Sequence, residues 1–344
     1  MNRLPMNILV IKTTSLGDVL HATPHLRAIR QQYPDAHISV LTARASAEIY
    51  AHNPAVDRLI LFDHARFKQL GPGSPRALTA LIKRTQAEIN DREYDLAFDL
   101  QGLLRSVIFL YLTRARKKFV KGHWPGLGGY ADKRLHAIDE MTQVLAEAGI
   151  PVTDTTLEFA RAPEVIDQLL TKMAKQGLNE LIERSRERQF VIISPFTRWS
   201  SKNWPLERFI QTASSLSQTH TVLITGTAKD RNAIKACLVR DPAINNVFNL
   251  AGEFNLAELA ELMSRAALVI SGDSFPMHLA AAVGVPLIAI FGPTDERKTG
   301  PRSADAVVIR PDTCQRCDEP DCSNACLGRI PVSKVESIAR EMLS

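Results

Sequence analysis

One stretch, residues 269–295, constrains the fold more than any other, because it is patterned as strand, turn, helix and strand in succession. The apolar run that ends at Ser271 predicts a buried strand. After it, Gly272 allows a sharp turn, Ser274 can cap a helix, and Pro276 suits the first helical turn. The stretch therefore predicts a βαβ unit of a parallel sheet.

The same stretch predicts a site for an anion. The helix is expected to end near Gly284, and a second buried strand is expected over residues 285–291. In a βαβ unit the helix N-terminus points to the carboxyl edge of the sheet, where unpaired N–H groups and the helix dipole favour a phosphate. Asp273 and His278 stand beside that point, and the loop at 292–294 closes the same edge. The alternative is an ordinary core crossover with a capped helix.

Length and composition are those of a globular protein with room for two domains. The chain has 344 residues, of which 45% are hydrophobic and 23% are charged. Its net charge of +5 indicates acidic substrates or an anionic surface, and it lacks the dense basic run of a nucleic-acid-binding tail. We find no signal peptide and no apolar stretch long enough to span a bilayer. We therefore expect a cytoplasmic protein, with peripheral contact at the inner membrane as an option.

Strand and helix patterns alternate in both halves of the chain. Strands are expected over residues 7–12, 37–41, 59–62, 94–100, 190–194, 221–225 and 247–250, and the first long helix over 19–32. Between Pro151 and about Glu187 the pattern is less regular, so the domain junction is expected there. Such alternation implies parallel sheets with helices on both faces. Two Rossmann-like domains, residues 1–175 and 176–344, with ligand loops at facing edges describe the GT-B type of glycosyltransferase fold.

The turn after the first strand, Thr13–His21, predicts a second site. Gly17 lets the backbone turn tightly, and Asp18 lies at the start of the following helix. One interpretation is that Asp18 only complements the helix dipole. The other is a general base, which takes a proton from an acceptor hydroxyl while that oxygen attacks a sugar carbon. A one-step displacement of this kind inverts the anomeric centre.

A third site is predicted in the segment after the first strand of the second half. The hydroxyls of Thr197 and Ser200, together with Lys202, can grip a diphosphate. Lys202 would neutralise the charge that grows on a leaving nucleotide. The nearby Trp199 and Trp204 either stack on a base or simply pack in the protein.

The loop Thr225–Asp230 follows the next strand and can border the ribose and base of a nucleotide, with Thr227 as the candidate residue. Its single glycine is not a dinucleotide fingerprint, since no G-x-G-x-x-G is present, and a P-loop lysine motif is absent as well. These absences argue against a dehydrogenase and against a P-loop kinase.

Basic residues gather in the first half: Arg105, Arg114, Arg116, Lys117, Lys118, Lys121, Lys133 and Arg134. They form either a solvated face or a landing surface for a phosphorylated or carboxylated acceptor.

Four of the five cysteines crowd into one segment: Cys314, Cys317, Cys322 and Cys326. In a reducing cytosol such a cluster predicts a metal site before it predicts disulfides, with zinc or a single iron held by four thiolates. The alternative is four reduced thiols in a surface loop. A bound metal would be a structural clip before the final helix, because none of these cysteines is placed to attack a sugar.

With these residues in view, the chain resembles the ADP-heptose:lipopolysaccharide heptosyltransferases of glycosyltransferase family 9. The resemblance lies in four stretches: residues 8–21, residues 99–106, Lys202 with Trp204-Pro205, and residues 272–295. It implies an inverting transfer of a heptose from ADP-heptose to an inner-core lipopolysaccharide sugar. It also implies that Asp18 is the base and that the transfer itself needs no metal or other cofactor.

The resemblance completes the set of candidate site residues. The donor candidates are Thr197, Ser200, Lys202, Thr227, Asp273, Ser274, His278, Gly292 and Thr294, and the acceptor candidates are Thr14, Ser15, Gln101 and Arg105. The cysteine-rich tail resembles that of many members, including protein-modifying heptosyltransferases in which iron binding is known.

Two departures from the family pattern bear on the donor sugar. The chain has Asp273-Ser274-Phe275 where the family often has Asp-Thr-Gly, so Phe275 replaces a small residue. Ala228 stands where some members carry an acid. The alternatives are the same fold acting on another nucleotide sugar or on protein serines, and a nucleotide-binding or metal-binding protein without turnover. The presence of Asp18 argues against the last, because binding alone needs no base.

Overall fold

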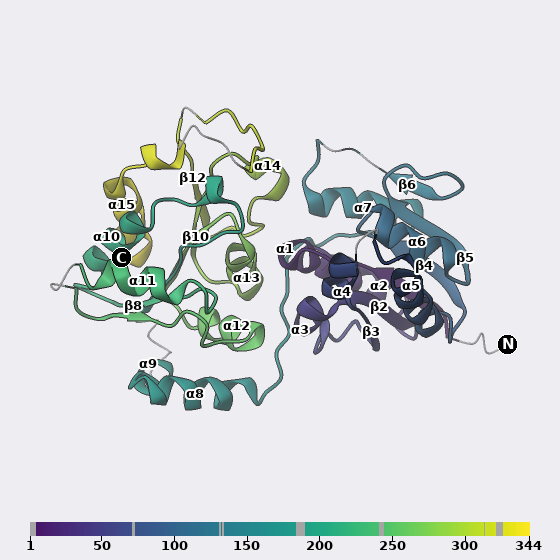
Figure 1. The fold of residues 1–344 in the computed structure, drawn as a ribbon, viewed down its shortest axis with the longest axis horizontal. Coiled ribbons are helices and arrows are strands. Elements are labelled where there is room, and N and C mark those ends of the chain that lie inside the picture. The colour runs from purple at the N-terminus through teal and green to yellow at the C-terminus, as the bar shows by residue number, and fades with distance from the viewer. Residues whose placement is uncertain are drawn as a thin grey trace. The chain divides into compact units, whose positions relative to one another are not determined.

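The computed structural model describes residues 5–70, 73–130, 132, 134–183, 190–240, 244–312, 314–320 and 326–344. The chain divides into two compact units, Met1–Ala160 and Arg161–Ser344. Each unit has its own six-stranded parallel sheet flanked by helices (Figure 1). This is the α/β architecture that the alternating sequence pattern predicts.

The sheet of the first unit has the strand order β3-β2-β1-β4-β5-β6, which is that of the Rossmann fold. Its strands are β1 (Asn7–Ile11), β2 (His37–Ala43), β3 (Arg58–Phe62), β4 (Tyr94–Asp99), β5 (Ala115–Lys121) and β6 (Gly128–Tyr130). Its helices are α1 (Leu16–Leu20), α2 (Thr23–Gln32), α3 (Ala47–Tyr50), α4 (His64–Leu70), α5 (Pro75–Ile89), α6 (Leu104–Leu112) and α7 (Ala137–Glu147). Helix α2 packs with α7 and α5 packs with α6. Right-handed crossovers put these two pairs on opposite faces of the sheet.

Strand β1 forms the centre of this sheet. Ile8 pairs with Ile38 of β2 on one side and with Leu96 of β4 on the other. Helices cover both faces, so a central strand of a parallel sheet is buried on both sides and is apolar along its length. The unbroken run Ile8–Ile11, which is fully buried, follows from this position.

The single helix predicted over residues 19–32 is wrong, because the structure has two. Helix α1 ends at Leu20, and α2 begins at Thr23 with Pro24 in its first turn. Proline lacks the N–H that a continuous helix needs, and its ring clashes with the preceding turn. The chain therefore turns at residues 21–22 and restarts.

The sheet of the second unit has the order β12-β11-β10-β7-β8-β9, which is again the Rossmann order when counted from β7. Its strands are β7 (Phe190–Ser194), β8 (Thr221–Ile224), β9 (Val247–Asn249), β10 (Leu268–Gly272), β11 (Leu287–Ile290) and β12 (Ala306–Ile309). Its helices are α8 (Val165–Lys175), α9 (Asn179–Glu183), α10 (Leu206–Leu216), α11 (Arg231–Leu238), α12 (Leu256–Ser264), α13 (Phe275–Val283), α14 (Glu296–Thr299) and α15 (Val332–Leu343).

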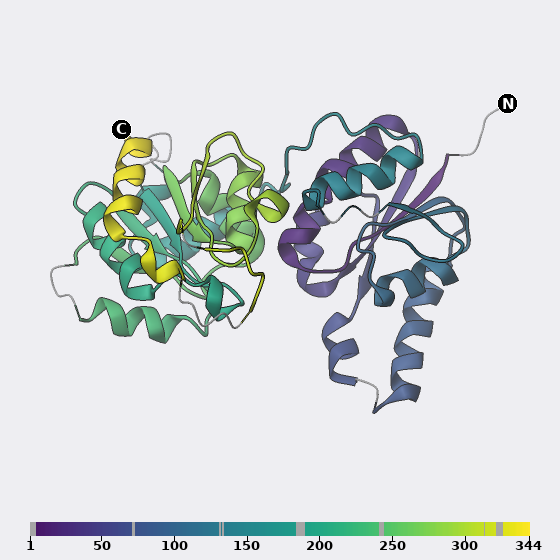
Figure 2. The same cartoon turned by 90° about the horizontal axis from the view of Figure 1, so that it is seen from above.

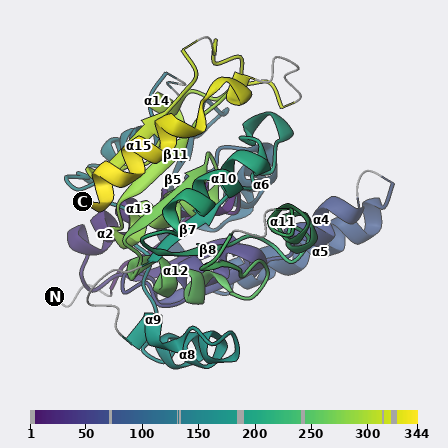
Figure 3. The same ribbon diagram turned by 90° about the vertical axis from the view of Figure 1, so that its left-hand side faces the viewer.

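Helix α15 lies along α10 and completes the core of the second unit (Figure 3). Its Val335 and Ala339 are fully buried, in one cluster with Trp204 and Phe209. On the other face, α12 packs with α13 and with α8. Lys172 of α8 reaches across to α12, where its Nζ lies 2.6 Å from Glu258 Oε2.

Helices α4 and α5 pack on each other and, in blue in Figure 2, project from the first unit. Helix α4 has no buried residue. Among the helices of the described ranges, none is both long enough and apolar enough to cross a membrane.

Candidate functional site

Both sheets place several of the predicted site residues where the strand order reverses. In the second unit the reversal lies between β7 and β10, which pair directly. Lys202 follows β7 and Asp273 follows β10. In open α/β sheets, ligands bind at the carboxyl ends of the strands beside this reversal.

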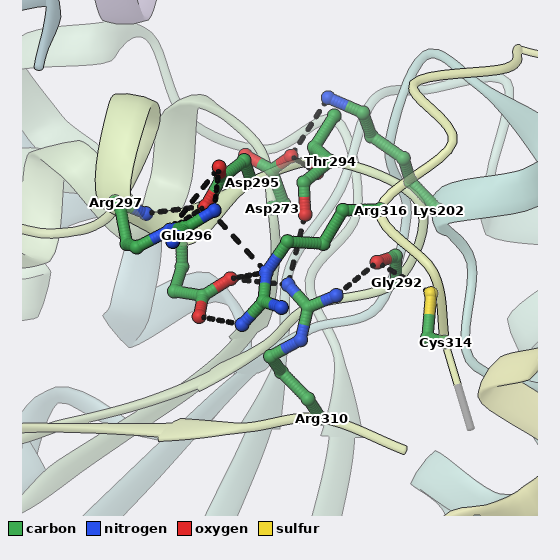
Figure 4. Close-up of polar contacts among 10 residues, drawn as sticks. All are labelled: Lys202, Asp273, Gly292, Thr294, Asp295, Glu296, Arg297, Arg310, Cys314 and Arg316. Atoms are coloured by element: carbon green, nitrogen blue, oxygen red, sulfur yellow. Dashed lines mark hydrogen bonds and ion pairs between the residues drawn. The ribbon is translucent and has the colours of Figure 1, made fainter. Parts of the chain in front are cut away.

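At this edge three predicted residues form one hydrogen-bonded group (Figure 4). Lys202 Nζ lies 2.7 Å from Asp273 Oδ2, and Thr294 Oγ donates to the same oxygen at 2.6 Å. The Asp273 side chain is only 5% exposed and that of Lys202 is 16% exposed. The group therefore combines a nearly buried carboxylate with a lysine whose side chain is partly exposed, so a positive charge is held at this edge.

Thr197 lies at the same edge of the second sheet, beside Gly272. A Cβ on Gly272 would lie 2.8 Å from Thr197 Cγ2, so the glycine is what lets the threonine approach β10. The Thr197 hydroxyl donates to the Trp199 carbonyl at 2.9 Å. Ser200 is exposed and begins the short helical turn that carries Lys202.

The two tryptophans near Lys202 have different surroundings. Trp204 is 1% exposed, donates through its indole N–H to the Ile330 carbonyl at 3.1 Å, and meets Phe209 edge to face. Packing is thus the correct interpretation of Trp204. The Trp199 ring lies under the Lys202 ammonium, 4.3 Å from Nζ to the ring centroid, in a cation–π contact.

Helix α13 begins and ends as the sequence predicts. Ser274 is its N-cap residue, Pro276 lies in its first turn, and Gly284 ends it in the left-handed conformation at φ 70°. His278, in the second turn, is buried. Ser274 Oγ lies 3.4 Å from the Gly272 carbonyl and makes no capping bond to the helix.

Thr227 is not part of the Lys202 group. Its N–H and its hydroxyl both donate to Asp230 Oδ2 at 2.7 Å, which folds the loop after β8 onto the start of α11.

In the first unit the strand order reverses between β1 and β4, and two loops are tied together there. The Gln101 side-chain oxygen accepts from the N–H groups of Thr13 and Thr14 at 3.3 and 3.1 Å. Arg105 donates to the Thr14 hydroxyl at 2.8 Å. Three of the four predicted acceptor residues, Thr14, Gln101 and Arg105, are thus brought together.

Asp18 is held by the fourth, Ser15. Asp18 Oδ2 accepts from the Ser15 N–H at 2.9 Å and from its hydroxyl at 2.7 Å. The bond from the Ser15 N–H belongs to a capping box at the start of α1, in which Ser15 is the N-cap residue and Asp18 the third helical residue. A local structural role of Asp18 is therefore established, and its role as a base stays a prediction.

Two buried ionisable residues that are not among the candidate site residues, Asp99 and Lys12, lie at the same edge of the first sheet. Asp99, the last residue of β4, is fully buried, and burial raises its pKa to about 6. Burial lowers the pKa of Lys12 to about 8, against the opposing charges of Asp18 and Asp99. Lys12 Nζ donates to the Leu100 carbonyl at 3.1 Å. A carboxylate that ends a buried strand two residues before Gln101 is the sequence signal for this group.

The described residues do not support the predicted zinc or iron site. Cys314 is buried and its thiol donates to the Gly292 carbonyl at 3.0 Å, whereas Cys317 is exposed. Cys322 lies outside the described residues, and Cys326 opens a short helical turn. Within the described ranges no three His, Cys, Asp or Glu side chains gather as a metal would need.

Comparison with known proteins identifies the family. Residues 82–327 match the sequence model described as glycosyltransferase family 9 (heptosyltransferase). The chain belongs to this family. Lipopolysaccharide heptosyltransferase 3 of Escherichia coli K12 is 28% identical over 295 residues, which cover 81% of this chain and 80% of that relative.

Two solved structures share the fold of this family 9 chain. The family 9 glycosyl transferase of Veillonella parvula DSM 2008 has a TM-score of 0.84 at 24% identity, covering 100% of this chain and 98% of that one. E. coli heptosyltransferase WaaC with ADP-2-deoxy-2-fluoro heptose has a TM-score of 0.74 at 21% identity, covering 98% and 99%. The predicted GT-B fold and the predicted enzyme class, a glycosyltransferase, are confirmed.

Proposed function

We propose that this glycosyltransferase moves a heptose from ADP-heptose to an inner-core sugar of lipopolysaccharide, with inversion at the anomeric carbon. The observation that carries the proposal is the group of Lys202, Asp273 and Thr294 at the carboxyl edge of the second sheet. Two comparisons support the substrates. A relative is named a lipopolysaccharide heptosyltransferase, and a structure of the same fold holds ADP-2-deoxy-2-fluoro heptose.

The donor is assigned to the second unit, where the partly exposed side chain of Lys202 pairs with Asp273, directly before the N-cap residue of α13. A diphosphate is attracted there by the lysine charge and by the positive end of the helix dipole. Asp273 holds the lysine at this edge, and Thr197, Ser200, Ser274 and His278 are the further donor candidates. As the sugar leaves the nucleotide, Lys202 offsets the charge that grows on the diphosphate.

The acceptor is assigned to the first unit, around Asp18. The Asp18 carboxylate takes the proton of the acceptor hydroxyl while the hydroxyl oxygen bonds to the anomeric carbon. The bond from that carbon to the phosphate oxygen breaks in the same step, and ADP leaves with the bonding electrons. Attack from the side opposite to the leaving group inverts the anomeric centre. Thr14, Gln101 and Arg105, which are already tied together, are assigned to the acceptor sugar.

The reaction is assigned to the cytoplasm, with peripheral contact at the inner membrane where a lipid-linked acceptor is presented. The exposed basic residues Arg114 and Lys117 of the first unit support this, because anionic lipids attract such side chains. Membrane-bound enzyme should be released by high salt. Release only by detergent would contradict peripheral contact.

Calorimetric titration with ADP-heptose, ADP-glucose and UDP-glucose tests the donor. Clear preference for ADP-heptose is expected, and Lys202→Met should weaken all three because it removes the charge that faces the diphosphate. Arg265→Gln, which changes an ion pair with Glu261 in the same unit, is the control and should leave binding unchanged. Preference for the uridine donor, or binding of none, would remove the heptose assignment.

A further inference from the structure

The loop that carries Thr294 is held in place by an arginine that neither the candidate set nor the resemblance includes. Arg310 directly follows β12. It donates to the Thr294 carbonyl at 2.9 Å and to the Gly292 carbonyl at 3.1 Å (Figure 4). It also forms an ion pair with Glu296, and its side chain is only 13% exposed. One largely covered guanidinium thus fixes two backbone carbonyls and one carboxylate.

The cysteine-rich segment supports the same loop from a second direction. Arg316 binds both Glu296 oxygens, at 2.7 and 3.2 Å, and Cys314 donates its thiol hydrogen to the Gly292 carbonyl at 3.0 Å. Glu296 lies between two guanidinium groups. The hydrogen bond from Arg316, together with the charge of Arg310, holds the pKa of Glu296 below its usual range. The segment therefore has a contact role here that does not depend on a metal.

The first residue of the loop, Gly292, has no side chain that could hold the loop in place. A Cβ on Gly292 would lie 3.0 Å from Leu327 and 3.3 Å from the Ser201 carbonyl, so only glycine fits without displacement. The backbone must be fixed from outside, and a planar guanidinium with five N–H donors can serve three acceptors at once. A lysine has the charge but not this geometry.

What the loop presents is the hydroxyl of Thr294. That hydroxyl donates to Asp273 Oδ2, and the same oxygen pairs with Lys202. Thr294 is thus bound on both sides, through its carbonyl to Arg310 and through its hydroxyl to Asp273. A shift of its backbone would change where Asp273 holds the ammonium of Lys202.

We propose that Arg310 is a positioning residue for the donor site: by fixing the carbonyls of Gly292 and Thr294, it sets the Thr294–Asp273–Lys202 group in the geometry that binds and activates the nucleotide sugar. The role assigned to Arg310 is exerted through the Thr294 loop, which is what its printed contacts hold. The inference rests on the proposed assignment of the donor to this edge, and it goes beyond that assignment to what holds the edge in place.

The test compares Arg310→Gln, Arg310→Lys and the control Arg265→Gln. Arg265 also pairs with a carboxylate, Glu261, and reaches a carbonyl, that of Ile182, but away from the Thr294 loop. A displacement of about 1 Å in a site can lower the rate about 10²-fold, so Arg310→Gln should lower kcat/KM to about that extent and raise the donor KM. Arg310→Lys should recover part of the loss. The control should destabilise the protein while leaving kcat/KM unchanged.

A double variant separates positioning from a general loss of stability. If Arg310 acts through Thr294, then Arg310→Gln should have little further effect on donor KM in a Thr294→Val background, because the link to Asp273 is already broken. Equal effects of Arg310→Gln in both backgrounds would overturn the proposal. So would wild-type kcat/KM in Arg310→Gln, or a loss of kcat/KM in the Arg265 control of the same size.

Binding of ADP alone keeps this test apart from the identity of the sugar. Arg310→Gln should weaken ADP about tenfold in calorimetry, corresponding to about 1.4 kcal/mol. If wild type fails to use ADP-heptose and yet ADP binding falls in this way, the heptose assignment fails and the positioning role stands. Unchanged ADP affinity in the variant overturns the positioning role, whatever the sugar.

Discussion

Replacing Asp18 with asparagine separates the two roles that this residue can have. In the structure its Oδ2 accepts from both the N–H and the hydroxyl of Ser15, and the bond from the N–H belongs to the capping box of α1. Asparagine keeps an oxygen that can accept the same two bonds, but it cannot take a proton from an acceptor hydroxyl. Alanine loses both abilities.

The structure sets different magnitudes for the two variants. Loss of a capping side chain typically costs about 1 kcal/mol, so Asp18→Ala should lower the melting temperature by about 2–4 °C for a unit of this size. Asp18→Asn should remain near the wild-type value. Loss of a general base lowers the rate about 10²–10⁴-fold, and both variants should show that loss in kcat.

The assay pairs calorimetric melting with turnover of the nucleotide sugar. Asn255→Ala is the control, since it also disrupts a capping box: Asn255 is the N-cap residue of α12 and accepts from the Glu258 N–H at 2.8 Å. It should lose about as much stability as Asp18→Ala and keep full turnover. Near-normal turnover in Asp18→Asn would refute the base and leave Asp18 as a cap alone.

Three further predictions concern buried groups. Trp204→Phe should lower the free energy of unfolding by about 1–3 kcal/mol in urea titrations and leave nucleotide affinity unchanged, because the indole donates to the Ile330 carbonyl in the core; weaker nucleotide binding at unchanged stability would instead indicate base stacking. Gly272→Ala should weaken donor binding in calorimetry, because the new Cβ would lie 2.8 Å from Thr197 Cγ2 and displace that side chain, and an unchanged affinity would place Thr197 outside the donor site. Burial raises the pKa of Asp99 from 3.8 to about 6, so the folded protein binds this proton more tightly than the unfolded chain does. The stabilisation that this proton gives the folded protein is therefore fully present below about pH 4 and is lost as pH rises through about 6. Urea titrations of the wild type should show this loss as a change of about 2–3 kcal/mol in the free energy of unfolding, and those of Asp99→Asn should not.

Much of the candidate site in the second unit could be predicted from the sequence, because its signals are local. Gly272, Ser274, Pro276 and Gly284 mark the turn, cap, first turn and end of one helix, and each acts through its own backbone preference. Parallel strands then bring the loops after them to one edge, so the sequence alone is enough to group Lys202 with Asp273. The position of Asp18 at a helix start could be predicted in the same way, from the first strand and the turn that follows it.

Contacts between distant segments could not be predicted in this way. Arg310 lies 16 residues beyond Thr294, and nothing in its own neighbours shows which carbonyls it will reach. The spacing of the cysteines also failed to show this kind of contact. It predicted four metal ligands, whereas the Cys314 thiol donates to the Gly292 carbonyl.

The packing of α15 has a consequence for the order in which the two units form during synthesis. The first unit is contiguous and ends at Ala160, so all of its strands have left the ribosome before the second sheet begins. The second core includes Val335 and Ala339, whose burial beside Trp204 closes one side of the sheet. Domains generally fold as units, N-terminal first. The first unit is thus complete early, whereas the second unit stays open, with part of its apolar face uncovered, until α15 has emerged.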